Sequence, residues 1–361
     1  MLLGLSTLFA VHKNLTYQRA LLISSSASEA VEHPPLILAG GEKRDRRLVN
    51  NGKLEKNNKN SSENEEQQLL NGAFIHFGKT GGSTLSLLLR NGCHSFIKKP
   101  CREVANETVA SKLIEFYYHV PDFGDLPNKN HSFYLVTLRD PFDRTKSAFA
   151  AQHPANDLAR GQAMTKVNYN GRTAAFRCFP SLEAFADLLG DDPTNYDYPY
   201  SPNQLIQKNC TNFARASLDG KVRRFNHWYF SYRKIRSLLP QYSPATIYAT
   251  RKENLAEDWN RVNQLLGEPQ EAKIPEQAVA RNYTGMRLPT TRDLSEGGRR
   301  RLCKALQSEY DYYMSFLWQA VNLKEDQVRE AVEYSKQNCP GVNYLSREEA
   351  LALFVEQGIA Q

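Results

Sequence analysis

Three short apolar runs, each followed by a polar turn and a helical pattern, constrain the fold of this chain most. They read AFIHF at 73 to 77, SFYLVTLR at 132 to 139 and TIYATR at 246 to 251. Near-continuous runs of β-branched and aromatic residues are typical of strands that are buried on both faces of a parallel sheet. We therefore predict an α/β fold for residues 72 to 361, as a single domain with a central parallel sheet and flanking helices.

Helical patterns follow the first and third runs. TLSLLLR contains helix formers and stops before Asn91 and Gly92, which suit a C-terminal cap. KENLAEDWNRVNQLLG ends at Gly267 and spaces apolar residues for one buried helical face, namely Leu255, Trp259, Val262 and the pair Leu265/Leu266. One long C-terminal helix is predicted from the spacing of Leu302, Leu306, Tyr310, Tyr313 and Leu317.

The N-terminal part differs in composition from the rest. MLLGLSTLFAV is about as long as a signal-peptide core, but no basic residue precedes it, and it is shorter than the roughly 18 residues of a spanning helix. We interpret residues 1 to 23 as a signal peptide, a truncated membrane anchor or the end of a wrongly assigned first exon. Residues 24 to 71 are polar and poor in aromatics, which predicts a flexible stem.

Charge, cysteines and glycosylation sequons indicate the kind of partner and the compartment. The formal net charge of +7 favours an anionic partner, and nucleotide phosphate, acidic glycan, nucleic acid and a membrane surface all qualify. The six cysteines lack metal-site spacing and suit either disulfides or buried thiols; they are Cys93, Cys101, Cys178, Cys210, Cys303 and Cys339. Sequons begin at Asn14, Asn60, Asn106, Asn130, Asn209 and Asn282. Together these features predict a secreted or secretory-pathway protein without a structural metal.

The stretch GKTGGST, which follows the first run, combines the features of a phosphate-binding loop. Gly81 and Gly82 let successive backbone N–H groups turn inward, the following helix presents its positive end, and Lys79 adds a cation. A Walker loop places its lysine after the last glycine, whereas Lys79 precedes both glycines, so the order does not fit an NTPase. An ordinary strand-to-helix turn is the simpler alternative, which the lysine and the Ser/Thr cluster disfavour.

The stretch LRDPFDRTKSAF, which follows the second run, suggests a second anion site. Arg139 ends the strand, Asp140 can cap the helix, and Pro141 suits its first turn. Arg144 and Ser147 are three residues apart and share a helical face directed back toward the end of the strand. Arg139 and Ser147 could then hold a second phosphate. An ordinary capped helix with a surface arginine would explain the same residues.

Both stretches resemble motifs of the sulfotransferases that use 3′-phosphoadenosine-5′-phosphosulfate, especially the Golgi carbohydrate enzymes related to heparan sulfate 6-O- and 2-O-sulfotransferases. FIHFGKTGGSTL resembles their 5′-phosphosulfate-binding loop, which is P-loop-like, and LRDPFDRTKSAF resembles their 3′-phosphate-binding segment. The resemblance implies transfer of a sulfuryl group to a hydroxyl of a carbohydrate, without a metal, in the Golgi lumen. An N-terminal membrane attachment would be compatible with it.

The resemblance also assigns site residues. The 5′-phosphate would be held by the backbone of Thr80, Gly81, Gly82, Ser83 and Thr84, with Lys79 as the catalytic cation. Arg139 and Ser147 would hold the 3′-phosphate. EFYYHVPDFGDL is similar to the family stretch that contains the catalytic histidine, which falls on His119, and imidazole suits a general base near neutral pH. The rivals of this histidine by position are His94, His131 and His153.

The acceptor side is less defined. YDYPYSPNQLIQKNC resembles the acceptor region of the family, but its Pro-Asn-Gln at 202 to 204 lacks the usual arginine, and its three tyrosines suit either sugar stacking or packing. TRKENLAEDW and YTGMRLPTTRDL look like the segments that close over the adenosine. Basic clusters suit either an anionic polysaccharide or a solvated face; they lie at 98 to 99, 221 to 224 and 299 to 301. The tail from Asn322 onward gives no functional interpretation.

Two other functions fit parts of the sequence. A nucleotide-dependent kinase would share the anion-binding loop, but it needs a Mg²⁺-binding acidic residue at a strand end, and none of the predicted strands ends that way. A non-catalytic, secreted glycan-binding protein would keep the fold and bind glycan without the donor. A nucleic-acid partner is not expected, and the oligomeric state is left open.

Overall fold

The computed structural model describes residues 71–89, 108–118, 131–153, 176, 178–190, 209–219, 231–239, 246–276 and 293–356. They all belong to one unit of the chain, Glu66–Gln361. The predicted signal or anchor at 1 to 23 and, except for Asn71, the predicted stem lie outside the described residues. Within the described ranges, no helix has the length and apolar character needed to span a membrane.

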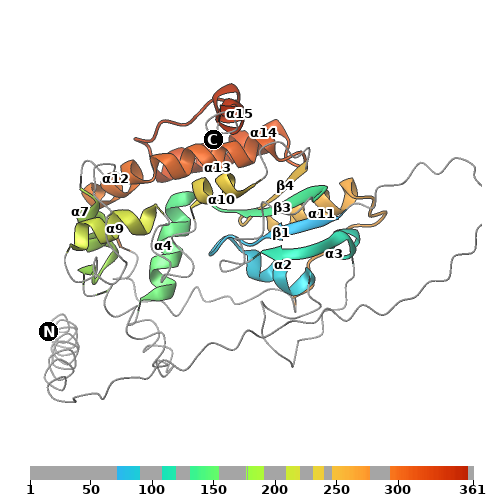
Figure 1. Cartoon of the computed structure of the whole chain (residues 1–361), viewed down its shortest axis with the longest axis horizontal. Helices are drawn as coiled ribbons and strands as arrows, with labels where there is room; N and C mark the ends of the chain where they lie inside the picture. Colours follow the sequence, from blue (N-terminus) through green and yellow to red (C-terminus); the bar gives the residue numbers. More distant parts are fainter. Residues whose placement is uncertain are drawn as a thin grey trace, which may run out of the picture. The chain divides into compact units, whose positions relative to one another are not determined.

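Among the described residues, a four-stranded parallel sheet forms the centre of the fold (Figure 1). Its order is β2-β1-β3-β4, and its strands are β1 (Gly72–Ile75), β2 (Ile114–Tyr118), β3 (Phe133–Leu138) and β4 (Thr246–Arg251). All three strands predicted from the apolar runs are present and pair in parallel. β2 was missed, because only IEFYY marks it and no helical pattern follows it clearly.

Helices flank the sheet on both sides, which confirms the predicted α/β class. They are α2 (Gly82–Leu89), α3 (Val109–Leu113), α4 (Pro141–Gln152), α7 (Leu182–Leu189), α9 (Cys210–Leu218), α10 (Tyr232–Leu238), α11 (Leu255–Leu265), α12 (Glu296–Ala305), α13 (Gln307–Gln319), α14 (Glu325–Asn338) and α15 (Arg347–Glu356). Side chains alternate along β1, so Phe74 packs with α2, α3 and α11, while Ala73 and Ile75 face the larger core with α4 and α13.

Two helix predictions need correction. In α11, Trp259 and Val262 are fully buried as expected, but Leu265 is 43% exposed, and Leu266 is the member of the pair that packs on the core. The single long C-terminal helix is two helices, α12 and α13, although all five predicted apolar residues are buried. The break is at Leu306, where ψ is 3° and the N–H also bonds the carbonyl of Cys303, three residues back, so the helix tightens into a turn.

The tail from Asn322 onward, which had no predicted role, completes the fold. The N–H of Val321 donates to the carbonyl of Ile247, and the Asn322 side chain bonds both the N–H and the C=O of Ala249 at 2.8 Å. Asn322 therefore satisfies backbone groups on the open side of β4, which has no further strand beside it within the described part of the chain.

Two disulfides are present in the described residues. Cys303–Cys339 joins α12 to the end of α14, and Cys178–Cys210 joins the segment before α7 to the start of α9. The disulfide interpretation of these four cysteines is thus confirmed, whereas Cys93 and Cys101 lie outside the described residues. Disulfides form in oxidising compartments, so the chain has the character of an extracellular or secretory-pathway protein.

Replacement of Asn322 tests the role of the tail. Asn322 is 2% exposed, so Asn322→Ala leaves two buried backbone groups of β4 without partners and should lower the free energy of unfolding by roughly 2 to 4 kcal/mol. The exposed Asn343 offers a matched control, since Asn343→Ala should change it by less than about 0.5 kcal/mol. Urea denaturation of both variants is the measurement, and equal stabilities would contradict the role.

Candidate functional site

The two predicted anion-binding stretches meet at one edge of the sheet. The chain runs from β1 to β2 on one side and then returns to β3 on the other side of β1, so the strand order reverses between β1 and β3. In open parallel sheets, ligands bind outside the carboxyl ends of the strands at this point of reversal. Ile75 pairs with Val136, which brings the loop after β1 beside the residues that follow β3.

The loop after β1 has an alternating backbone conformation. Lys79 has φ 68° and Gly81 has φ 87°, whereas Thr80 between them and the helical Gly82 after them have negative φ. Such alternation turns successive N–H groups toward one side and makes a concavity that binds anions. Lys79 adopts a conformation that is unfavourable for a residue with a side chain, so the surrounding structure must hold it there.

Three consecutive carbonyl groups of the loop are held by side chains. Thr80 Oγ1 donates to the carbonyl of Phe77 at 2.7 Å, Arg144 Nε to that of Gly78 at 3.1 Å, and Arg139 Nη1 to that of Lys79 at 3.3 Å. The carbonyl oxygens, which would repel an anion, are therefore engaged by the protein itself. These three hydrogen bonds fix the carbonyl side of the loop in one arrangement.

Thr80 has a structural side chain. It is fully buried, and its Oγ1 lies 2.6 Å from Oγ1 of Thr137 on β3. Its predicted contact to phosphate therefore depends on its backbone N–H alone. Thr84 is also part of the helix start, since its N–H donates to the carbonyl of Gly81 at 3.0 Å. The predicted residues Lys79 to Thr84 are thus brought together as one turn at the start of α2.

Gly81 and Gly82 are required for different physical reasons. Gly81 is required by its positive φ, as the sequence suggested. Gly82 is helical, and a Cβ there would lie 2.1 Å from Cδ2 of His76, so the glycine is required by the close approach of this imidazole. His76 is a buried residue that the sequence analysis missed; it follows β1, stacks on Phe74, and donates its N–H to the carbonyl of Tyr118.

A double-mutant cycle tests the contact between His76 and Gly82. Gly82→Ala should destabilise the fold by about 1 to 3 kcal/mol, because the new methyl group overlaps the ring. With His76→Ala in the same chain, most of this cost should disappear, which gives a coupling of at least about 1 kcal/mol. Chemical denaturation of the four proteins measures it. Strictly additive effects would show that the ring does not impose the glycine.

Arg139 connects the two stretches. Its backbone is fixed from both sides by Tyr232, whose hydroxyl accepts from the N–H at 3.0 Å and donates to the C=O at 2.7 Å. Its guanidinium bonds the carbonyl of Lys79, and Nε lies 3.9 Å from Oε1 of Glu253. The side chain is 15% exposed. Arg139 therefore lies beside the loop and is mostly, but not completely, buried.

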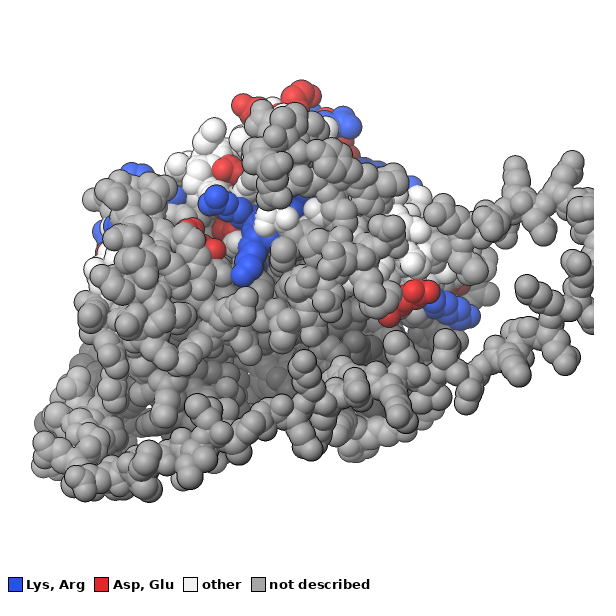
Figure 2. Space-filling view, viewed as in Figure 1, with Lys and Arg blue, Asp and Glu red and all other residues white. Residues whose placement is uncertain are grey.

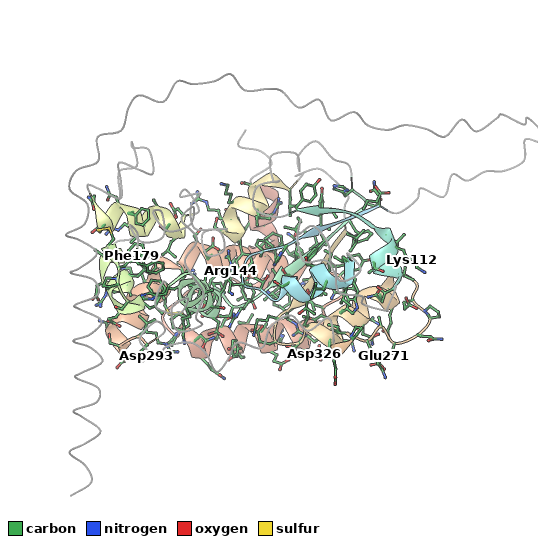
Figure 3. The ribbon with its side chains drawn as sticks, turned by 90° about the horizontal axis from the view of Figure 1, so that it is seen from below. Lys112, Arg144, Phe179, Glu271, Asp293 and Asp326 are labelled. Carbon is green, nitrogen blue, oxygen red and sulfur yellow. A yellow bond between two sulfur atoms is a disulfide. The ribbon has the colours of Figure 1, made fainter. Side chains whose placement is uncertain are left out.

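Arg144 has a positioning role. The side chain is buried, and Figure 3 labels it near the centre of the view. Its Nη1 lies 3.3 Å from Oε2 of Glu309, and its guanidinium lies 4.9 Å from the centre of the Tyr232 ring. Burial raises the pKa of Glu309 to about 7, and the charge of Arg144 opposes this shift. Ser147 lies one turn further along α4 and is 9% exposed. The alternative of a surface arginine on this helix is therefore wrong.

Asp140 caps α4 as predicted and does more. Its Oδ1 accepts from the N–H of Asp143 at 2.9 Å, and its Oδ2 accepts from the hydroxyl of Tyr310 at 2.9 Å. Asn338 of the tail donates to Oδ1 at 3.3 Å. Burial raises the pKa of Asp140 to about 6, although these hydrogen bonds favour the ionised form. The start of α4 is thus held by residues from α13 and α14.

The pKa of Asp140 predicts a pH effect. The folded chain keeps this proton up to about pH 6, whereas an unfolded chain releases it near pH 4, so the contribution of Asp140 to stability falls as the pH rises through this window. Asp140→Asn removes the titration and keeps an acceptor for the cap. The variant should therefore gain roughly 2 to 3 kcal/mol relative to the parent between pH 4 and 7. Urea denaturation across this range measures it, and parallel curves would contradict it.

His119 lies outside the described residues. In sequence it directly follows Tyr118, the last residue of β2, the strand beside β1. Of its rivals, His94 is also outside. His131 and His153 are buried: Nε2 of His131 lies 3.1 Å from the Tyr118 hydroxyl, and Nε2 of His153 donates to the carbonyl of Pro180 at 2.8 Å. These two histidines have contacts that explain them structurally.

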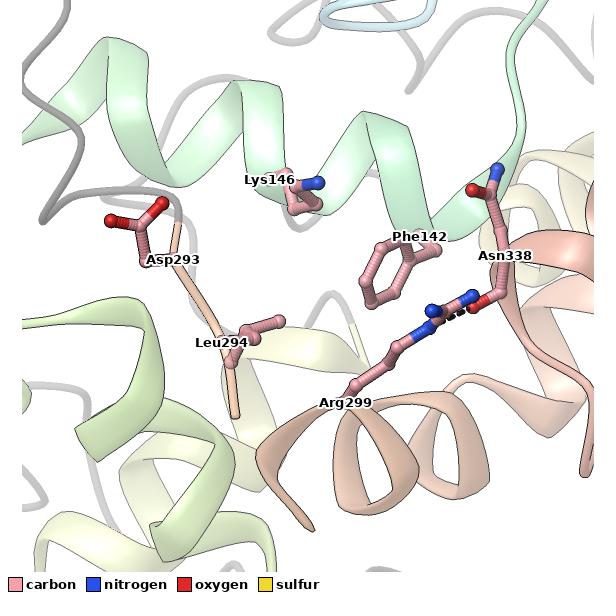
Figure 4. Close-up of a pocket in the computed structure, with 6 residues that line it drawn as sticks. All are labelled: Phe142, Lys146, Asp293, Leu294, Arg299 and Asn338. Carbon is pink, nitrogen blue, oxygen red and sulfur yellow. Dashed lines mark hydrogen bonds between the residues drawn. The ribbon is translucent and has the colours of Figure 1, made fainter. Parts of the chain in front are cut away.

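A pocket of about 470 Å³ lies on another face of α4 (Figure 4). It is lined by Phe142, Lys146, Asp293, Leu294, Arg299 and Asn338. The cations of Lys146 and Arg299 lie 5.1 and 5.7 Å from the centre of the Phe142 ring, and Arg299 also bonds the carbonyl of Asn338. On the same helix Arg144 reaches the loop after β1, so this pocket is distinct from the candidate site.

Two arginines of the basic cluster at 299 to 301 serve the fold, whereas Arg300 is exposed. Arg299 is bound to the carbonyls of Gln337 and Asn338, and Arg301 pairs with Asp187 and Glu183. Figure 2 shows basic side chains beside acidic ones on the described part of the visible face. The other two basic clusters lie outside the described residues. So does the predicted acceptor region YDYPYSPNQLIQKNC, except for its last two residues, Asn209 and Cys210, at the start of α9.

Because the comparisons with known proteins found no match, the assignment of the candidate site rests on the residues of this chain. No family model matches it, and no curated protein or solved structure matches it either. Among the described residues, no three His, Cys, Asp or Glu side chains gather as possible ligands of a metal ion.

Proposed function

We propose that this chain is a sulfotransferase that moves a sulfuryl group from 3′-phosphoadenosine-5′-phosphosulfate to a hydroxyl of a carbohydrate. The observation that carries the proposal is the junction of two anion-binding features at the β1/β3 edge. The alternating loop and the start of α2 lie beside Arg139, which bonds the carbonyl of Lys79. The resemblance of both stretches to the sulfotransferase motifs supports the same donor.

The donor would bind by its two phosphates. Of the predicted residues 80 to 84, residues 80 to 83 would offer backbone N–H groups to the 5′-phosphate together with the positive end of α2, as in a P-loop-like turn, whereas the N–H of Thr84 already donates to the carbonyl of Gly81. Arg139 and Ser147 would hold the 3′-phosphate, which ATP lacks, and so select the donor. Arg144 and Tyr232 would position these groups without touching the ligand.

The reaction would be an in-line displacement. The acceptor oxygen attacks sulfur while the bond from sulfur to the 5′-phosphate oxygen breaks, and 3′-phosphoadenosine-5′-phosphate leaves. His119 would take the proton of the attacking hydroxyl, and Lys79 would neutralise the charge that develops on the leaving oxygen. The two disulfides among the described residues indicate a secretory-pathway protein, which agrees with the sulfation of glycans in the Golgi lumen.

The kinase alternative needs a free acidic residue near the loop for Mg²⁺. Among the described residues, Asp140 follows the end of β3 and Glu253 follows the end of β4, and both have partners. Asp140 caps α4 and binds Tyr310, while Glu253 lies between Arg139 and Lys252. The glycan-binding alternative predicts that His119→Ala behaves like the parent.

Calorimetric titration of the full chain tests which nucleotide it binds. The parent should bind 3′-phosphoadenosine-5′-phosphate at least about tenfold more tightly than ADP or Mg-ATP, because only this ligand carries the 3′-phosphate. Arg139→Ala should weaken that binding by about tenfold to a hundredfold through loss of a charge-assisted contact. Binding of Mg-ATP alone, or of none of these ligands, would refute the sulfotransferase proposal.

A sulfate-transfer assay separates enzyme from binding protein. The parent should transfer sulfate to a member of a panel of glycan acceptors. His119→Ala should lower the transfer rate by about a hundredfold or more and leave the affinity for 3′-phosphoadenosine-5′-phosphate unchanged. This result would support His119 as the base. Donor binding without sulfate transfer by either protein would favour a non-catalytic protein, and equal transfer by parent and variant would rule out His119 as the base.

A further inference from the structure

A carboxylate lies between two cations at the edge where the candidate site is formed. Oε1 of Glu253 is 3.9 Å from Nε of Arg139 and 4.0 Å from Nζ of Lys252. Arg139 is already part of the proposed donor site. Lys252 and Glu253 lie in the stretch TRKENLAEDW, whose resemblance implies closure over the adenosine, but neither has been assigned to a phosphate. Both follow directly after β4, the strand next to β3.

The backbone holds Lys252 firmly at this place. The preceding residue, Arg251, forms a buried ion pair with Asp258 at 2.8 Å, and its Nη1 donates to the carbonyl of Gln327. The N–H of Lys252 donates to the carbonyl of Leu138 at 2.9 Å, directly before Arg139 in sequence. Lys252 is therefore fixed across the ends of β3 and β4.

The side chain of Lys252 reaches the phosphate-binding loop. A Cβ on Gly81 would lie 3.4 Å from its Cγ, so the aliphatic stem covers the glycine. Lys252 thus lies against the loop with its stem and near Arg139 with its charge. Burial and the charge of Arg139 lower the pKa of Lys252, as expected where positive charge is concentrated.

Glu253 compensates this charge only loosely. Both N–O distances exceed a hydrogen bond, and the side chains of Lys252 and Glu253 are 42% and 33% exposed. Ion pairs at such distances are weak, whereas a phosphate carries more charge and forms short charge-assisted bonds. A phosphate group that enters between the two cations can therefore replace the carboxylate.

From this geometry we infer that Lys252 is a further phosphate-binding cation of the donor site and that Glu253 occupies the place of a donor phosphate until the donor binds. The inference rests on the proposed function. Glu253 would act as an internal competitor: it keeps Arg139 and Lys252 from repelling each other in the free protein, and it turns to solvent when the nucleotide arrives.

Calorimetry on the full chain with 3′-phosphoadenosine-5′-phosphate tests this inference. Glu253→Gln removes the competing charge and keeps the shape, so binding should tighten by about threefold to tenfold. Lys252→Met keeps the stem over Gly81 and removes the charge, so binding should weaken by about tenfold and depend less on salt. Glu271 and Lys273 form a matched control pair, 3.5 Å apart and well exposed, where Glu271→Gln and Lys273→Met should have no effect.

The outcomes separate this inference from the proposed function. If the parent binds the nucleotide and needs Arg139, but Glu253→Gln and Lys252→Met bind as the parent does, this inference alone is overturned. If the parent does not bind the nucleotide, the proposed function fails and this inference fails with it. A gain of affinity in Glu253→Gln cannot result from misfolding, so it supports the inference even where Lys252→Met is unstable.

Discussion

The parallel pairing of β1 with β3 is the constraint on which the rest of the site depends. Because the chain places β2 on one side of β1 and β3 on the other, the turns after β1 and β3 leave the sheet side by side. Stretches some sixty residues apart in sequence thereby share one edge. Thr80 and Thr137 bond across this junction, so the sheet and the loop fix each other.

The loop after β1 needs this support because its own conformation is unfavourable. Lys79 has a positive φ without being a glycine, and three successive carbonyls must find donors inside the protein. Arg144 and Arg139 provide two of these donors, and the buried Glu309 balances the charge of Arg144. The cost of burying an arginine is thus compensated by an ion pair and by backbone acceptors.

The C-terminal part of the chain supports the same edge from behind. Tyr310 of α13 and Asn338 of α14 hold Asp140 at the start of α4, and Cys339 next to Asn338 is joined to Cys303 of α12. The side chain of Asn322 forms hydrogen bonds with the backbone N–H and C=O of Ala249 in β4. A segment without any recognisable motif therefore holds the start of α4 at this edge of the sheet.

The sequence by itself determined three of the four strands that the structure describes, the cap at Asp140 and the pair of stretches that form the candidate site. These features depend on local periodicity and on residues with special backbone or charge properties. It missed β2, the break at Leu306, the exposure of Leu265 and the reason for Gly82. Tertiary structure alone brought His76 under α2, buried Arg144 beside Glu309, and set Glu253 between Arg139 and Lys252. These contacts join residues that are distant in sequence, and only the packing of strands and helices decides which distant residues meet.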